Sequence, residues 1–226
     1  YSRAFWEYLQ RYSRDEFKGT RILMAHVHDG AELHFASKQV KTLEDLKGLK
    51  VRAPTRIGTR MITALGMTPI QMPAPQVPES IAKGVVDGAS LPWEVVPALK
   101  VNEVTKSHTE TGQNQRKMSN TIFVVAMNEA KYNSLPADLK KVIDANSGAE
   151  ASVWAGKIWD STIAPGRKSA TDRGNTVNVL TPAEYARWVK ATDSVAQDWV
   201  KDVSAKGNDG NKLLSTAKTL LDQYDR

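Results

Sequence analysis

Residues 43–54 read Leu43-Glu-Asp-Leu-Lys-Gly-Leu-Lys-Val-Arg-Ala-Pro54 and join a short turn to a buried strand. Thr42 is placed to cap the turn, and the strand from Lys50 ends at the proline. Arg52 lies inside this strand near its carboxyl end, where open α/β sheets bind their ligands. A buried guanidinium needs an anion, and a carboxylate offers the best bidentate geometry. Either an internal Asp or Glu or a bound ligand should therefore face Arg52.

Strands and helices alternate on both sides of this stretch. Apolar runs predict strands at 21–27, 33–36, 68–72, 121–127 and 177–179. Helical spacing predicts helices at 5–12, 55–65, 79–83, 134–158, 181–203 and 213–224. Residues 100–117 are polar with few apolar positions, and we expect a strand, a loop and a crossing segment there whose limits the pattern does not resolve. This alternation is typical of an α/β fold.

The composition is that of an ordinary globular protein. The chain has 226 residues, 41% of them hydrophobic and 25% charged, which suits one large domain or two small ones. No window approaches the roughly 18 consecutive apolar residues of a membrane helix. The absence of cysteine excludes disulfides, thiolate metal sites and a cysteine nucleophile, but it leaves the compartment open.

The net charge of +6 favours anionic partners of any size. The densest basic stretch comprises Lys47, Lys50, Arg52, Arg56 and Arg60. Glu44 and Asp45 dilute it, and no aromatic residues alternate with the basic ones as a single-strand stacking surface would require. We therefore expect solvated surface at the lysines and at Arg60, and no nucleic-acid partner.

Common catalytic signatures are missing. The sequence has no phosphate-binding GxxxxGK[ST], no GxGxxG after a strand, no HExxH and no GxSxG. Ser215 and Lys218 match S-x-x-K, but they lie on the terminal amphipathic helix without the companion motifs of penicillin-recognising enzymes. The sequence therefore predicts a protein that is not an enzyme and has no cofactor.

Three histidines near the N-terminus suggest an alternative. His26 and His28 share one face of a strand, His34 follows, and Asp29 and Glu32 are the nearest carboxylates. Two histidines at this spacing make at most half of a zinc or nickel site. Histidines that border a cleft are the favoured interpretation, so no metal is expected, and a histidine-based metal-dependent enzyme remains the less favoured function.

Four segments carry a family resemblance. Residues 43–54, Ala64-Leu-Gly-Met-Thr-Pro69, Lys83-Gly-Val-Val-Asp-Gly88 and, after Asn128, Leu135-Pro-Ala-Asp-Leu-Lys140 resemble the periplasmic solute-binding subunits of TRAP transporters, DctP type. The segments occur in the family's order and spacing. The resemblance implies a two-lobed α/β clamshell in the periplasm that closes on a small organic acid and delivers it to a membrane permease. A ligand sensor of the same fold is the alternative.

The resemblance also implies a ligand site. In this family the arginine of the first segment holds the substrate carboxylate, and Arg52 occupies that position. Trp93 is expected as an apolar wall, with Ser90 or Leu91 beside it, although a core tryptophan is almost equally expected. The other candidates are Thr55 and Asn120 as hydrogen-bonding partners, His28 or His34 as donors to a second polar group, and Glu32, which stands in a loop where some relatives carry a second arginine.

Finally, the resemblance implies that the first lobe is incomplete in this chain, because the family's first βαβ unit would precede Tyr1. We expect residues 1–29 and 120–160 to be the remnant of lobe one, and 30–119 and 161–226 to form lobe two. The opening helix carries Phe5, Trp6 and Leu9 on one face, which predicts packing partners upstream. An incomplete lobe leaves a free sheet edge, so a homodimer is expected.

Overall fold

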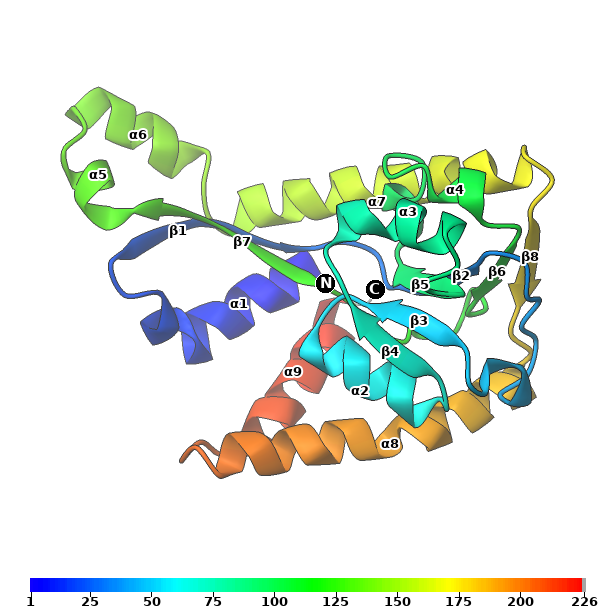
Figure 1. Cartoon of the computed structure of the whole chain (residues 1–226). Coiled ribbons are helices and arrows are strands. Elements are labelled where there is room, and N and C mark those ends of the chain that lie inside the picture. Colours follow the sequence, from blue (N-terminus) through cyan, green and yellow to red (C-terminus); the bar gives the residue numbers. More distant parts are fainter. Residues whose placement is uncertain (225–226) are drawn as a thin grey trace. The chain divides into compact units, whose positions relative to one another are not determined.

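The computed structural model describes residues 1–224, which fold into two compact units (Figure 1). Unit 1 comprises Tyr1–His28, Thr121–Asp160 and the chain from Val200 onward. Unit 2 comprises Asp29–Asn120 and Ser161–Trp199. The first three boundaries differ from the expected lobe limits by at most one residue. The expectation that the segment from Val200 belongs with lobe two is wrong.

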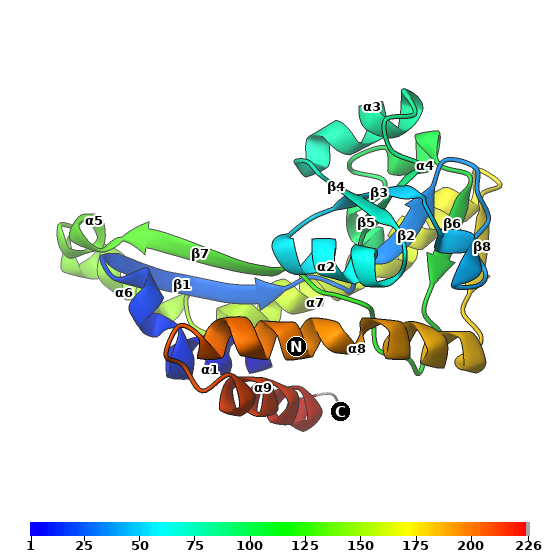
Figure 2. The same ribbon diagram turned by 60° about the horizontal axis from the view of Figure 1, so that its bottom comes forward.

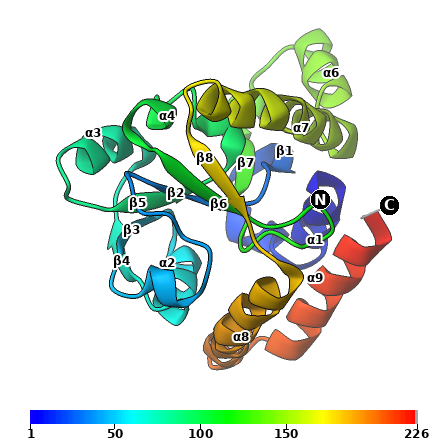
Figure 3. The same cartoon turned by 90° about the vertical axis from the view of Figure 1, so that its right-hand side faces the viewer.

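Unit 2 is built on a six-stranded mixed sheet. Its strands lie in the order β4 (Thr68–Gln71), β3 (Lys50–Ala53), β5 (Gly88–Leu91), β2 (Glu32–Phe35), β6 (Ser107–Glu110) and β8 (Thr176–Val179). β3 runs parallel to β4 and β5, and β6 runs parallel to β8. β2 runs antiparallel to both of its neighbours. Figure 3 shows β8 beside β6, at the edge of this sheet.

Helices cover both faces of the unit 2 sheet. On one face, α2 (Arg56–Ala64) and the start of α8 (Pro182–Ser204) bury a core that includes Leu33, Phe35, Val51, Ile62 and Trp188. On the other face, α3 (Val77–Ala82), α4 (Val101–Val104) and the later part of α7 (Ala149–Thr171) bury Val77, Ile81, Ala89, Val101 and Ala170. The sheet is therefore the middle layer of an α/β/α sandwich, as the alternating pattern predicts.

Unit 1 contains a two-stranded antiparallel ribbon of β1 (Thr20–Val27) and β7 (Ile122–Asn128). α1 (Ser2–Tyr12) lies against this ribbon (Figure 2). It packs there because its apolar residue Leu9 joins Ile22 and Ala25 in a small core. The backbone N–H of Ala25 donates to the hydroxyl of Ser152, at 3.0 Å. Side chains of neighbouring elements thus satisfy part of the outer edge of β1.

The terminal helix α9 (Gly210–Tyr224) belongs to unit 1 because it lies along α1, as Figure 2 shows. The hydroxyls of Tyr12 and Thr216 are 3.2 Å apart, and the hydroxyl of Tyr224 donates to the carboxylate of Glu7. An amphipathic pattern on α9 predicts that one face is covered, but it does not specify the covering element. The assignment to lobe two fails for this reason.

The helix predicted at 134–158 is divided in the structure. α5 (Glu129–Asn133) is capped by Asn128, whose side chain accepts from the N–H of Lys131, and it ends before residue 134. α6 (Ala137–Ala145) follows the proline turn and covers the first part of the predicted helix. Gly148 then adopts φ of +92°, and its N–H donates to Leu23 in β1, so α7 starts as a separate helix. None of the described helices is long and apolar enough to cross a bilayer.

Candidate ligand site

Arg52 belongs to a row of residues that crosses the whole unit 2 sheet. The paired positions, from β4 to β8, are Ile70, Arg52, Ala89, His34, His108 and Val177. Directly paired residues of neighbouring strands point to the same face of a sheet. The row therefore faces α3, α4 and α7, and it brings Arg52 and two histidines onto one surface.

The guanidinium of Arg52 is held in place but its charge is not neutralised. The residue is 6% exposed, its Nε donates to the carbonyl of Met72 at 3.1 Å, and its Nη1 donates to the carbonyl of Ser90 at 3.2 Å. Among the described residues, no carboxylate pairs with it. Burial accordingly lowers the pKa of Arg52. A buried cation with two carbonyl contacts and no counter-ion is a good receptor for an anion.

The amino end of α2 lies three residues beyond Arg52. Thr55 is exposed and caps this helix, because its hydroxyl oxygen accepts from the N–H of Gly58 at 3.0 Å. A helix amino end presents unpaired N–H groups and favours negative charge. Thr55 thus has a structural role as a cap, and its place as a ligand contact stays a prediction.

Trp93 lies two residues after the end of β5 and is buried in the core, with 1% of its surface exposed. Its indole N–H donates to Oε2 of Glu110 at 3.0 Å. Arg167 donates to the same carboxylate through Nε at 3.0 Å and Nη2 at 2.9 Å. These contacts place Trp93 among core residues of unit 2. Its role as a ligand wall, with the buried Ser90 and Leu91 beside it, stays a prediction.

Glu32 is fully buried and has an internal partner. Its carboxylate accepts from the ammonium of Lys117 and from the N–H of Thr111, which is 3.3 Å away. Burial raises the pKa of Glu32 to about 8, and the charge of Lys117 acts in the opposite direction. The sequence pattern did not identify Lys117, which lies at the end of the polar stretch in which the pattern does not resolve the limits of the elements. Glu32 is therefore committed to a contact within the protein.

The remaining candidates lie in different places. His34 is fully buried against His108, and both belong to the row that contains Arg52. Asn120 is exposed at the last position of the first segment of unit 2. His28 belongs to unit 1, where its ring centroid lies 5.3 Å from that of Phe123 and 6.4 Å from that of Trp159. The structure thus groups Arg52, Ser90, Leu91, Trp93 and His34 within one unit.

The histidine pattern does not produce a metal site in the described chain. Among residues 1–224, no three His, Asp or Glu side chains are placed to hold one ion. The Nδ1 of His26 instead accepts from the indole N–H of Trp159, at 3.0 Å. Burial and the nearby His28 both lower the pKa of His26.

A cavity of about 130 Å³ in unit 2 lies away from Arg52. It is lined by Met61, Leu65, Arg116, Lys117, Met118, Tyr185, Trp188, Val189 and Thr192. Leu65 and Trp188 belong to the core on the sheet face opposite the row that contains Arg52. The ammonium of Lys117 is already paired with Glu32. The cavity is thus a separate, mostly apolar depression.

A sequence model of bacterial extracellular solute-binding protein, family 7, matches residues 4–202. The C4-dicarboxylate-binding periplasmic protein DctP of Shewanella loihica is 25% identical over 174 residues, which cover 76% of this chain and 50% of that protein. The chain thus spans about half the length of the curated relatives it matches.

Two solved structures are more similar. A TRAP solute binding protein from Rhodoferax ferrireducens T118, in complex with copurified benzoate, is 43% identical with a TM-score of 0.96; the match covers 99% of this chain and 70% of that one. A marine metagenome TRAP solute binding protein specific for aromatic acid ligands, in complex with 3-hydroxybenzoate, is 39% identical with a TM-score of 0.96; the match covers 100% of this chain and 70% of that one.

Proposed function

The chain belongs to family 7 of the bacterial extracellular solute-binding proteins, and on this basis we propose that it is the ligand-binding subunit of a TRAP-type transporter. It captures a small organic acid in the periplasm and passes it to membrane permease subunits, without catalysis. The observation that carries this proposal is the Arg52 guanidinium, which is buried and oriented by two carbonyl groups and has no carboxylate partner in the described chain.

A carboxylate is the anion that best completes this arrangement. Nε and Nη1 of Arg52 are occupied by carbonyl oxygens, which fix the plane of the guanidinium and leave its remaining N–H groups for a ligand. A charge-assisted hydrogen bond contributes about 1.5–3 kcal/mol, and more where water is excluded. Arg52 therefore supplies a large part of the binding free energy.

The ligand class that we propose is a small aromatic monocarboxylate. Two solved relatives, 43% and 39% identical to this chain, are described with benzoate and with 3-hydroxybenzoate. One carboxylate is favoured over two because residues 30–32 read Gly-Ala-Glu and supply no second arginine. The nearby ammonium of Lys117 is moreover paired with Glu32, so it is not free to bind a second carboxylate.

Native mass spectrometry of the purified protein, followed by calorimetry with benzoate, tests this proposal. We expect a copurified acid in the native spectrum and binding of benzoate that Arg52→Ala reduces by about a hundredfold. Unchanged benzoate affinity in a folded Arg52→Ala variant would overturn the assignment of Arg52. Absence of any acid from the spectrum, together with no binding of benzoate by the wild-type chain, would overturn the ligand class.

We also propose that two copies of this chain pair through β7. Among the described strands, β7 pairs only with β1, so its other edge faces no strand, and none of its residues is charged. Ile122, Phe123 and Val125 are 57%, 40% and 43% exposed. Uncharged edge strands readily add a second strand, and antiparallel pairing of two β7 strands is self-complementary.

A further inference from the structure

Three buried polar side chains of unit 2 form a continuous chain of hydrogen bonds. Nδ2 of Asn175 lies 3.2 Å from the carbonyl of Asn102 and 3.1 Å from Nε2 of His108. Nδ1 of His108 lies 2.7 Å from Nδ1 of His34. Nε2 of His34 lies 2.9 Å from the carbonyl of Leu91. The chain thus runs between two backbone carbonyls, one in α4 and one at the end of β5.

These two carbonyls determine where every proton of the chain lies. A carbonyl can only accept, so Nε2 of His34 carries a proton, and the NH₂ group of Asn175 faces Asn102. The second N–H of Asn175 then points at Nε2 of His108, which must accept. Neutral His108 therefore carries its proton on Nδ1 and donates it to the unprotonated Nδ1 of His34. A single proton thus lies between the two Nδ1 atoms, so one of them donates and the other accepts.

The same geometry excludes a charged ring. A proton added to His108 would sit on Nε2, opposite the N–H of Asn175, and a proton added to His34 would sit on Nδ1, opposite the N–H of His108. Burial also lowers the pKa of His34 to about 4 and that of His108 to about 3. Two charged groups also act on the pair: Glu110 raises the pKa of His34, and Arg167 lowers the pKa of His108. Both rings are therefore neutral at physiological pH.

The chain ends next to the group that orients Arg52. Nε2 of His34 donates to the carbonyl of Leu91, and Nη1 of Arg52 donates to the carbonyl of the preceding residue, Ser90. Ala89, the residue before that, separates Arg52 from His34 in the row across the sheet. Pro92 follows and has no N–H, so it adds no donor that could anchor this end of β5.

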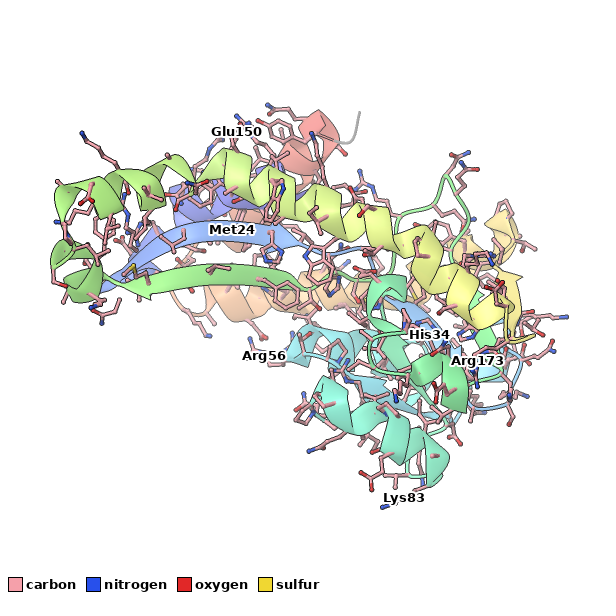
Figure 4. All side chains as sticks on the ribbon, turned by 90° about the horizontal axis from the view of Figure 1, so that it is seen from above. Met24, His34, Arg56, Lys83, Glu150 and Arg173 are labelled. Carbon is pink, nitrogen blue, oxygen red and sulfur yellow. The ribbon has the colours of Figure 1, made fainter. Side chains whose placement is uncertain are left out.

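Trp93 covers both histidine rings. Its ring centroid lies 4.9 Å from that of His34 and 4.9 Å from that of His108. The indole is itself fixed by its hydrogen bond to Glu110. Water is thus kept from the hydrogen-bonded rings, which fits a positioning function better than direct contact with a ligand. Figure 4 shows His34 inside unit 2, whereas Lys83 of the same unit extends outward.

We propose that His34 and His108, oriented by Asn175, form a neutral relay that fixes the carbonyl end of β5 and thereby positions the guanidinium of Arg52. The relay consists of His34, His108 and Asn175. Its consequence for ligand binding rests on the function proposed above for Arg52. His34, His108 and Asn175 are therefore positioning residues, which act on Arg52 through β5 and need not contact the ligand.

Two substitutions of His34 separate positioning from packing. His34→Gln keeps an N–H donor at the distance of Nε2 and so keeps the bond to Leu91, whereas His34→Leu fills the space but has no donor. We expect His34→Leu to weaken benzoate binding about tenfold and His34→Gln to weaken it clearly less, about threefold. A packing role predicts the reverse order, because leucine is apolar. Equal effects, or a smaller effect of His34→Leu, would overturn the proposal.

Nuclear magnetic resonance on the wild-type chain tests the relay without a ligand or a substitution. The sequence has 4 histidines, so long-range ¹H–¹⁵N spectra resolve each ring. Between pH 5 and 8, His34 should be the Nε2–H tautomer and His108 the Nδ1–H tautomer, without titration. The opposite tautomers, or a titration near pH 6.5 in either ring, would overturn the relay.

The Nε–H signal of Arg52 keeps this proposal distinct from the proposed function. We expect this signal to shift and exchange faster in His34→Leu than in His34→Gln, whether or not benzoate binds. If the wild-type chain does not bind benzoate but the signal responds in this order, the ligand proposal fails and the relay is supported. If benzoate binds and the Arg52 signal is the same in both variants, the relay fails and the ligand proposal is supported.

Discussion

The fully buried carboxylate of Glu32 is paired with the ammonium of Lys117, 85 residues further along the chain. The pair fastens the segment before Asn120 to the start of β2, where the N–H of Ala31 also donates to the carbonyl of Ser119 at 2.7 Å. Gly30 makes this approach possible, since a Cβ at this position would lie 1.9 Å from Cβ of Lys117. The side chain of Lys117 thus requires a glycine at position 30.

Lys117→Met should destabilise the protein strongly, because it leaves a buried carboxylate without its counter-charge. We expect the free energy of unfolding in urea to fall by about 3 kcal/mol. The double variant Glu32→Gln with Lys117→Met removes both charges and should recover a large part of this loss. If single and double variants unfold at the same urea concentration, the ion pair is not the cause.

Arg52→Lys should weaken benzoate binding by about tenfold or more, although it keeps the positive charge. A lysine cannot reproduce the two bonds from Nε and Nη1 to Met72 and Ser90 and still present a planar pair of donors. Arg56→Lys, at the exposed start of α2, is the matched control and should bind like the wild type (Figure 4). Calorimetry that finds full affinity in Arg52→Lys would show that a point charge is sufficient.

Gly166→Ala should destabilise the protein, against the usual preference of helices for alanine. A Cβ on Gly166 would lie 2.2 Å from the carbonyl oxygen of Trp93, so α7 would have to move away from the turn after β5. We expect a loss of about 2 kcal/mol in urea unfolding. At an unobstructed site in a helix the same change stabilises by up to about 1 kcal/mol, so a gain in stability would contradict this close approach.

Acid should destabilise the protein through His34 and His108. Burial lowers the pKa of His34 to about 4 and that of His108 to about 3, whereas an unfolded histidine titrates near 6.5. Below pH 6.5 the unfolded chain therefore binds more protons than the folded chain, and the free energy of unfolding falls as the pH falls. The stabilisation is complete above about pH 6.5.

We expect each histidine to contribute a loss of roughly 2 kcal/mol between pH 7 and pH 4.5. Urea unfolding of the wild type and of His108→Gln at both pH values measures this difference. The variant should lose less stability than the wild type, since one of the two groups no longer titrates. Parallel losses in the two proteins would exclude His108 as a source of acid sensitivity.

Val125→Lys should reduce self-association through β7. The residue is 43% exposed on a strand without charges, and lysine on an edge strand opposes pairing with a second copy. Light scattering over a concentration series should show a dimer for the wild type and a monomer for the variant. A wild-type chain that stays monomeric at all concentrations would contradict pairing through this edge.

The sequence was sufficient to locate Arg52, because a charged residue between Val51 and Ala53 in a strand that ends at proline is a local signal. It was not sufficient for the relay. β6 reads Ser-His-Thr-Glu, yet its first three residues are buried. Their burial depends on partners far along the chain, such as the carbonyl of Val40 that accepts from the hydroxyl of Thr109 at 2.7 Å. Hydrophobic patterning cannot detect a strand of this kind.

The limits of the helix predictions have a similar cause. The apolar spacing predicts one helix over 134–158, but α6 ends at Ala145, and Gly148 donates to β1 before α7 begins. For Trp93, the sequence left a core position and a ligand wall almost equally favoured. The hydrogen bond to Glu110 and the packing on two histidines are tertiary contacts, which no local pattern encodes.

The pairing of β6 with β8 has a consequence for the time course of folding. Thr176 pairs with Ser107, and residues 121–160 of unit 1 lie between them in the chain. The six-stranded sheet of unit 2 therefore cannot be completed until the middle segment of unit 1 has been synthesised. Trp188, which joins the core on one face of this sheet, is synthesised later still. Pairings between such distant segments slow folding. The two units must mature together rather than in succession, and a nascent chain that stops before residue 176 exposes β6 as an unfinished edge.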